Sequence, residues 1–151
     1  RANIMWAGML AHNNVCGVGR TQDWNSHSFG HELSALYDCA HGASLSVAMP
    51  AVLKYVMKHD VMRFAKVANR VWGCDMDFDN PEITAAAGIN ALQNFFSYIG
   101  MPKNFEELGA KERDIDRLVQ KLCCSKERQG YIEGFVKLSK EDCKNIYRLM
   151  L

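Results

Sequence analysis

The chain has 151 residues, 18 basic and 17 acidic side chains, and an apolar content of 48%. This size and composition are those of one globular domain with a sizeable core. The near balance of charge argues against a nucleic-acid-binding surface or a polybasic membrane surface. The apolar runs are also too short to cross a bilayer. We therefore expect one soluble domain over residues 1–151.

The cysteines indicate the cellular compartment of the protein, and the first residues indicate whether the chain is part of a longer one. Six cysteines occur without a CxxC pair, and a domain of this size needs no disulfide framework, so we expect reduced thiols in a cytoplasmic protein. No signal peptide opens the sequence. The chain begins at Arg1 and continues as "ANIMWAGMLAHNNV", with helical spacing but no capping residue. We expect it to be part of a longer protein.

Helical patterns dominate the first half of the chain. The apolar positions from Ile4 to Leu10 predict a helix that stops at the glycines of "CGVGR". A second helix is expected over residues 24–37, with Thr21 or Asn25 as its N-cap. Residues 43–59 predict a long buried helix that is kinked or broken near a proline, Pro50. Residues 60–73 continue as an amphipathic helix that ends at a glycine.

The second half has equally clear helix boundaries. Asn80 and Pro81 favour a helix start, and Gly100 marks the end of that helix. Residues 112–124 place their apolar side chains on one face. Ser139 is expected to cap a last helix, with a buried side formed by Ile146, Leu149 and Met150. Since no strand-like alternation or repeat is sustained, the fold class is all-α, a single bundle of about seven helices.

Three of the five histidines lie within "HSFGHELSALYDCAHG". His27 and His31 are four residues apart and therefore share one face of the second helix. His41 follows a short turn and starts the next helix, so a chain reversal can return it toward the first pair. Neutral imidazoles suit zinc and ferrous iron, although a catalytic site usually needs at least three protein ligands. Solvated or core histidines are the ordinary alternative for such a pair.

The nearby carboxylates do not complete a metal site. Glu32 lies about 100° around the helix from His31, and Asp38 belongs to the turn. We expect Glu32 to form a salt bridge or a cap contact and Asp38 to end the helix or close the turn. The pattern therefore predicts that further ligands come from protein outside this sequence.

These motifs resemble a known family. The segment "SHSFGHELSALYDCAHG", together with "RANIMWAGMLAHN" and "LSVAMPAVLKYV", is similar to the C-terminal domain of the iron-containing alcohol dehydrogenases, in particular the butanol dehydrogenase branch. The resemblance runs from the first residue to the last. It implies that this sequence lacks an N-terminal α/β domain and the start of the helical domain. The absent α/β domain would make most of the contacts with NAD(P)H.

The resemblance also implies roles for the histidines. Members of the family hold their metal through an aspartate, a histidine four residues later, and two further histidines fourteen residues apart. His27 and His41 match the last two as ligands of Fe²⁺ or Zn²⁺, and His31 matches a histidine that approaches the substrate and the nicotinamide. The first two ligands have no counterpart here. The implied reaction is reversible hydride transfer between a nicotinamide and a small aldehyde or primary alcohol.

Other readings of the sequence stay open. The chain by itself could be an inactive helical module that associates with a copy of itself, because loss of a neighbouring domain exposes apolar surface. A homo-oligomer is expected on the same ground. The parent protein could also be a related polyol dehydrogenase. The glycines of "GVGR" lack the complete phosphate-loop pattern and predict a turn. Trp24 and Phe29 are either walls of an alcohol pocket or part of the core, and His12 and His59 are expected at the surface.

Overall fold

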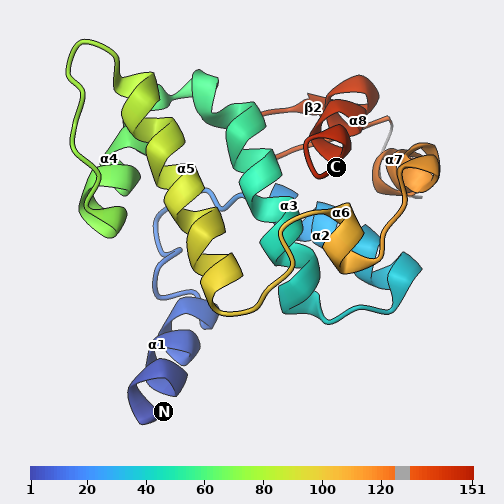
Figure 1. Ribbon diagram of the computed structural model, residues 1–151, viewed down its shortest axis with the longest axis horizontal. Helices are drawn as coiled ribbons and strands as arrows, with labels where there is room; N and C mark the ends of the chain where they lie inside the picture. Colours follow the sequence, from blue (N-terminus) through green and yellow to red (C-terminus); the bar gives the residue numbers. More distant parts are fainter. Residues whose placement is uncertain (125–129) are drawn as a thin grey trace.

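A computed structural model describes residues 1–124 and 130–151 of the chain. Within these ranges there are eight α-helices and one two-stranded antiparallel ladder (Figure 1). This confirms the all-α class. The α-helices are α1 (Ala2–His12), α2 (Asn25–Tyr37), α3 (His41–Val56), α4 (Val61–Trp72), α5 (Pro81–Tyr98), α6 (Phe105–Leu108), α7 (Ile115–Cys123) and α8 (Lys140–Arg148). Short 3₁₀ turns cover Met57–His59 and Glu112–Asp114, and the strands are β1 (Tyr131–Ile132) and β2 (Leu138–Ser139).

The main core lies where α2, α3, α7 and α8 meet. Phe29 and Leu33 from α2 are completely buried, as are Leu118 from α7 and Ile146 from α8. The ring of Tyr147 meets Phe29 edge to face, with centroids 4.9 Å apart. Helix α3 crosses the centre of the molecule and joins this core to the α4–α5 pair (Figure 1). The buried face of α2 therefore fixes where its opposite face presents the histidines.

A close crossing of α4 and α5 forms the other side of the molecule. A Cβ atom built on Gly88 would lie 2.7 Å from the Cα atom of Ala68, which is closer than real side chains approach. Ala65 and Ala85 are buried in the same interface. Small residues at these positions let the two backbones approach, and Gly73 ends α4 in the left-handed conformation, as expected.

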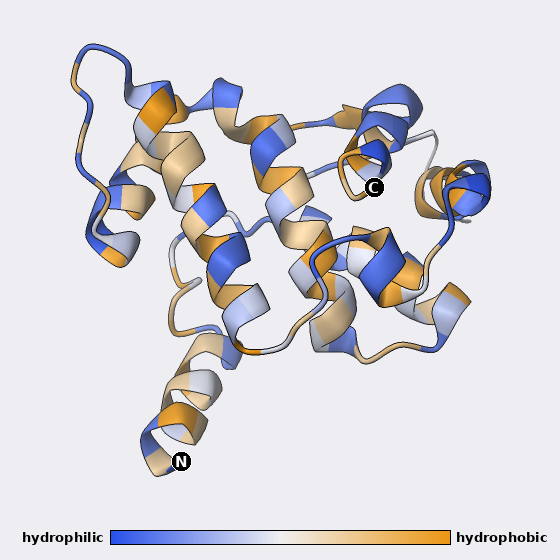
Figure 2. Ribbon diagram, viewed as in Figure 1, coloured by the Kyte–Doolittle hydropathy of each residue, from blue (hydrophilic) through white to orange (hydrophobic). Residues whose placement is uncertain are grey.

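Helix α1 stands apart from the rest of the molecule. It has no buried residue, and Figure 1 shows it projecting away from the other helices. Its exposed apolar side chains include Ile4, Met5 and Trp6, which are 78%, 74% and 63% exposed. Figure 2 shows this apolar content on a helix with no neighbour along most of its length. The helix ends at His12, before the glycines that were expected to stop it, and turns fill residues 13–19.

Several predicted helix boundaries were wrong in detail. The N-cap of α2 is Trp24, not Thr21 or Asn25. The Asn25 amide instead donates to the carbonyl of Val136, at 3.3 Å, and its backbone N–H donates to Asp23 Oδ1, at 3.1 Å. Tertiary contacts thus occupy the residue that was expected to cap the helix.

Helix α3 is not broken at its proline. It runs as one α-helix from His41 to Val56 with Pro50 inside it, and its neighbours Ala48 and Ala51 are buried. Burial on both sides of the proline holds the helix together where local sequence favours a break.

The C-terminal segment confirms one prediction and corrects another. Ser139 and Asp142 form a capping box at the start of α8. Ile146 and Met150 are buried as expected, but Leu149, the first residue after α8, is 51% exposed. The ladder pairs Tyr131 with Ser139, and its two-residue strands are too short to give an alternating pattern.

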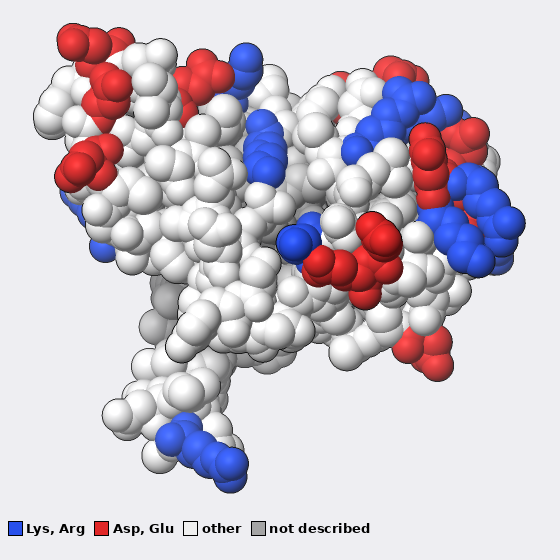
Figure 3. Space-filling view, viewed as in Figure 1, with Lys and Arg blue, Asp and Glu red and all other residues white. Residues whose placement is uncertain are grey.

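The charged surface agrees with the balance of the composition. On the face seen in Figure 3, basic and acidic side chains are mixed over α7 and α8. Lys144 and Asp116 bridge these helices at 2.6 Å. None of the helices described combines the length and apolar character that a bilayer crossing requires.

Candidate functional site

A tight corner between α2 and α3 brings the three histidines together. Helix α2 ends at Tyr37, and the next residue, Asp38, adopts the left-handed conformation at φ 49° and ψ 36°. Ala40 precedes α3, and its carbonyl accepts the backbone N–H groups of Ala43 and Ser44. His41 is therefore the first residue of α3, as predicted from the sequence. The reversed chain direction returns it to the face of α2 that carries His27 and His31.

Close packing between the two helices sets the spacing of the imidazoles. Gly30 is buried, and a Cβ atom there would lie 2.9 Å from Leu45 Cδ2 and 3.1 Å from Ser44 Oγ. Ser34 donates a hydrogen bond to Ser44 Oγ at 2.8 Å, and Ser44 donates to the carbonyl of His41 at 2.9 Å. This chain of hydroxyls ties the first turn of α3 to α2. The glycine between the two helix histidines thus serves helix packing.

The three imidazole rings form one cluster. The ring centroids of His27 and His41 are 5.4 Å apart, and those of His31 and His41 are 5.0 Å apart. His27 and His31 are separated by 6.1 Å. Two imidazoles bound to one tetrahedral ion, at metal–nitrogen distances of about 2.0–2.1 Å, have centroids about 5 Å apart. The separations of His27 from His41 and of His31 from His41 are both close to this value, so the centroid distances are compatible with a shared metal ion for either pair.

Burial affects the three imidazoles differently. His27 is half-buried, whereas His31 and His41 are exposed. Burial lowers the pKa of His27, and the nearby His41, His31 and His12 lower it further. A lowered pKa favours the neutral imidazole, which is the form that binds a metal.

The carboxylates of the corner lie away from the imidazoles. Burial raises the pKa of Tyr147, and the charge of Glu32 raises it further, which places Glu32 toward the core side of α2. Asp38 occupies the left-handed end of α2. Within residues 1–124 and 130–151, no group of three or more histidine, cysteine, aspartate or glutamate side chains is arranged to hold a metal ion. The described residues therefore contain no complete metal site.

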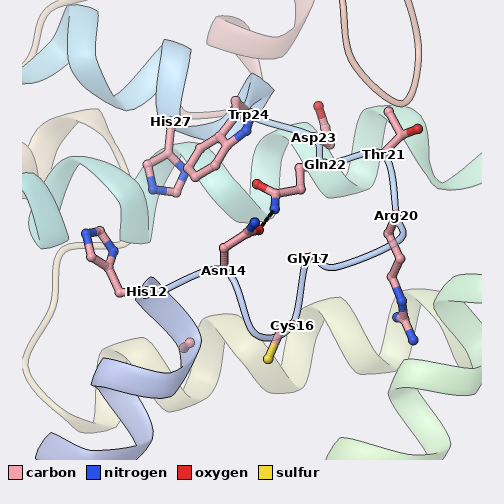
Figure 4. A pocket seen from close by; sticks show the side chains of 11 residues that line it. His12, Asn14, Cys16, Gly17, Arg20, Thr21, Gln22, Asp23, Trp24 and His27 are labelled. Atoms are coloured by element: carbon pink, nitrogen blue, oxygen red, sulfur yellow. Dashed lines mark hydrogen bonds between the residues drawn. The ribbon is translucent and has the colours of Figure 1, made fainter.

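An open pocket of about 640 Å³ adjoins His27. It is formed by the end of α1, the loop after α1 and the start of α2. Trp24 is 55% exposed and meets His27 edge to face, with centroids 5.0 Å apart. It therefore forms a wall of this pocket, whereas Phe29 belongs to the core. Figure 4 shows His12 at the same end of the pocket as His27.

The position of His12 was missed by the sequence analysis. It is exposed, as expected, but it lines the pocket and lies close enough to His27 to lower its pKa. Residues 13–19 fold as turns, so "GVGR" is a turn as predicted. The path of these turns decides where the end of α1 lies, and no local pattern around His12 reveals it.

Comparison with known proteins decides the family. The C-terminal model of the Fe-containing alcohol dehydrogenase family matches residues 1–151. The chain belongs to the iron-containing alcohol dehydrogenase family. It is 31% identical, over 149 residues, to NADH-dependent butanol dehydrogenase A of Clostridium acetobutylicum, covering 98% of the chain and 38% of that protein. It is 35% identical to the NADPH-dependent aldehyde reductase YqhD of Escherichia coli over 122 residues, which cover 81% of the chain and 31% of that protein.

Solved structures of family members share this fold. A crystal structure of NADH-dependent butanol dehydrogenase A from Thermotoga maritima superposes with a TM-score of 0.90 at 32% identity, covering 99% of this chain and 38% of that one. The substrate- and cofactor-free aldehyde reductase YqhD superposes with a TM-score of 0.87 at 28% identity, covering 99% of this chain and 38% of that one. The 151 residues thus span less than half the length of these family members. The ligand and catalytic roles of His27, His41 and His31 stay predictions.

Proposed function

We propose that the chain is the C-terminal, metal-binding part of an NAD(P)H-dependent alcohol dehydrogenase. The proposed reaction is reversible hydride transfer between the nicotinamide and a small aldehyde or primary alcohol. One observation carries the proposal: His27 and His41 converge across the α2–α3 corner, at 5.4 Å between ring centroids, in a chain that matches the family over its whole length. The names of the relatives support this class of reaction.

The two imidazoles are the proposed protein ligands on this chain. His27 and His41 would hold Fe²⁺ or Zn²⁺, and donors from outside residues 1–151 would complete the site. When bound, the metal supplies Lewis-acid polarisation of the substrate oxygen. The chain itself keeps His27 half-buried against Trp24 and favours its neutral form. The NAD(P)H would be bound mainly by a separate nucleotide-binding domain.

His31 is the proposed catalytic residue. Its ring lies 5.0 Å from that of His41, between centroids, and it is exposed to solvent. An imidazole in this position can orient the alcohol and pass its proton toward water. The Gly30 packing contact holds this face of α2 against α3 and therefore fixes His31 relative to the two proposed ligands.

The metal content of the full-length enzyme that carries this chain tests the three roles separately. We expect His27→Ala and His41→Ala to lose both bound metal and turnover. His31→Ala should keep its metal but lose turnover and change its pH profile. His59→Ala is the control, because His59 is an exposed histidine in the 3₁₀ turn after α3. Full metal occupancy in either ligand variant would refute the proposed site.

A reduced cytoplasmic protein is part of the proposal. All six cysteines lie within the described ranges, and none of them forms a disulfide there. The buried sulfur atoms of Cys123 and Cys143 are 3.6 Å apart, a hydrogen-bonding distance rather than a bond. Free thiol labelling of the unfolded protein after rapid quenching should detect all the cysteines.

The exposed face of α1 favours a second candidate, in which the chain forms a homo-oligomer without activity of its own. Ile4 and Trp6 are largely exposed and no residue of α1 is buried. Contact with a second copy would cover this surface. Sedimentation of the 151-residue chain should then show a dimer or larger species, and Trp6→Glu should shift it toward the monomer. A monomer at high concentration would refute this candidate.

A further inference from the structure

The pocket beside His27 has the size of a small-molecule site. Its volume of about 640 Å³ lies within the range of roughly 300–1,000 Å³ found for ligand pockets. Most of its lining residues are polar, in contrast to the groove between α4 and α5, which is lined almost entirely by apolar side chains. A substrate whose tail is only an alkyl chain would form no hydrogen bonds with these polar side chains. The lining therefore suits a ligand that has a second polar group.

The two ends of the pocket differ in chemistry. His12, Trp24 and His27 gather at one end, and Arg20 lies at the opposite end of the view in Figure 4. If the reacting carbon of a substrate lies near His27, the rest of that molecule extends along the pocket toward Arg20. The residue at the far end then contacts the tail of the substrate rather than its carbonyl group.

Arg20 provides an available positive charge at that end. Among the residues that the structure describes, no carboxylate forms a salt bridge with it. The one carboxylate in the lining, Asp23, accepts the backbone N–H of Asn25 at 3.1 Å and lies against Gly134. It is therefore already engaged with its own helix start and with the loop between the strands.

Two further polar side chains of the lining are paired with each other. Gln22 donates a hydrogen bond to Asn14 across the turn. Gly17 leaves room for this pair, because a Cβ atom there would collide with the Gln22 amide. The amide pair therefore closes one side of the pocket, and Arg20 is left as the charged group that can bind a ligand.

We infer that Arg20 binds an anionic oxygen group on the tail of the substrate, so that the enzyme acts on short aldehydes that carry a carboxylate, and on the matching hydroxy acids. This inference rests on the proposed function and specifies its substrate class. A guanidinium forms two parallel hydrogen bonds with a carboxylate, which gives both affinity and orientation. A phosphate of the nicotinamide cofactor has the same chemistry, and the test below separates these two sources.

The experiment uses the full-length enzyme that carries this chain. Turnover is measured with 4-oxobutanoate and 5-oxopentanoate, each against the neutral aldehyde of the same length, butanal or pentanal. Arg20→Gln removes the charge, and Arg20→Lys keeps it without the planar fork. Arg117→Gln is the matched control, because Arg117 is an exposed arginine on α7 and does not line the pocket. Binding of succinate, which cannot react, is measured by calorimetry.

The wild type should favour the oxo acids over the neutral aldehydes. Arg20→Gln should lower kcat/KM for the oxo acids about tenfold, through KM, and weaken succinate binding by a similar factor. The kinetics of Arg20→Gln with butanal should not change. With the oxo acids, kcat/KM of Arg20→Lys should fall between the values of the wild type and Arg20→Gln. Arg117→Gln should match the wild type with every substrate.

Three results would overturn the inference. Equal kinetics of the wild type and Arg20→Gln with the oxo acids would exclude the contact. A raised KM for NADH or NADPH, with no change for the oxo acids, would assign Arg20 to a cofactor phosphate instead. If the wild type reduced no aldehyde, the proposed function would fail, and succinate binding that did not depend on Arg20 would then exclude the anion site as well.

Discussion

The buried hydroxyl of Tyr147 allows a sharp test of the core. Tyr147 is completely buried between the Phe29 and Phe105 rings. Among the described residues its Oη atom has no hydrogen-bond partner. Replacing Tyr147 by Phe removes a polar group that was taken out of water without compensation. We therefore expect this substitution to stabilise the protein, by about 1–3 kcal/mol in the free energy of unfolding.

A second tyrosine provides the matched control. Tyr55 donates a hydrogen bond to Asp142 Oδ1 at 2.6 Å. Tyr55→Phe removes this paired hydroxyl, and we expect it to lower the free energy of unfolding by about 1 kcal/mol. Urea unfolding of the 151-residue chain, followed by far-UV circular dichroism, measures both variants. For a domain of this size, the melting temperature should move by about 2–4 °C for each kcal/mol.

Alkaline pH gives an independent readout of the same group. Burial raises the pKa of Tyr147 well above its ordinary value of 10.0. The unfolded chain therefore releases this proton near pH 10 while the folded chain keeps it, so the free energy of unfolding falls as pH rises above about 10. Below about pH 10 this contribution is fully present. Tyr147→Phe should make the loss of stability between about pH 9 and pH 11 shallower.

One outcome would refute this reasoning. If Tyr147→Phe destabilised the chain by as much as Tyr55→Phe does, the Tyr147 hydroxyl would have a hydrogen-bond partner in solution. An unchanged alkaline slope would show that the pKa of Tyr147 is not raised, and therefore that its hydroxyl reaches water.

Substitutions at three further positions test local packing and capping, all by urea unfolding. Gly88→Ala should lower the free energy of unfolding by about 1–3 kcal/mol, because its Cβ atom would meet the backbone of Ala68; a neutral effect would show that the α4–α5 crossing can relax. Gly8→Ala, on α1 where a Cβ atom meets nothing within 4 Å, should raise helix stability by about 0.5–1 kcal/mol. Ser139→Ala should cost about 1 kcal/mol, because the capping box with Asp142 is lost, and Ser139→Asp should restore most of it.

The sequence predicted those parts of the fold that depend on neighbours along the chain. Gly73 and Ser139 act through the geometry of their own helix ends, and both helix boundaries were predicted from these residues. The start of α2 was not, because the Asn25 side chain bonds to Val136, far away in the sequence. The break that was one of the expectations at Pro50 is absent for a similar reason, since burial of its surroundings outweighs the local preference for a break.

The residues of the candidate site also differ in whether local sequence predicts their positions. His27, His31 and His41 lie on two helices joined by one short corner, so helical spacing alone predicts that they meet. His12 and Arg20 join the pocket only through the path of the turns between α1 and α2. Such turns depend on contacts that have no periodic pattern in the sequence, and the pocket therefore emerges only from the structure.

The crossing of α2 and α3 at Gly30 makes the geometry of the histidines sensitive to a single methyl group. A larger residue at Gly30 would push Ser44 and Leu45 outward, and His41 would move with them because it lies at the start of the same helix. If His27 and His41 bind a metal ion as proposed, a substitution at Gly30 would change the distance between the two ligands without touching either of them. Small side chains at residue 30 would therefore adjust the spacing of the histidine cluster from inside the helix interface.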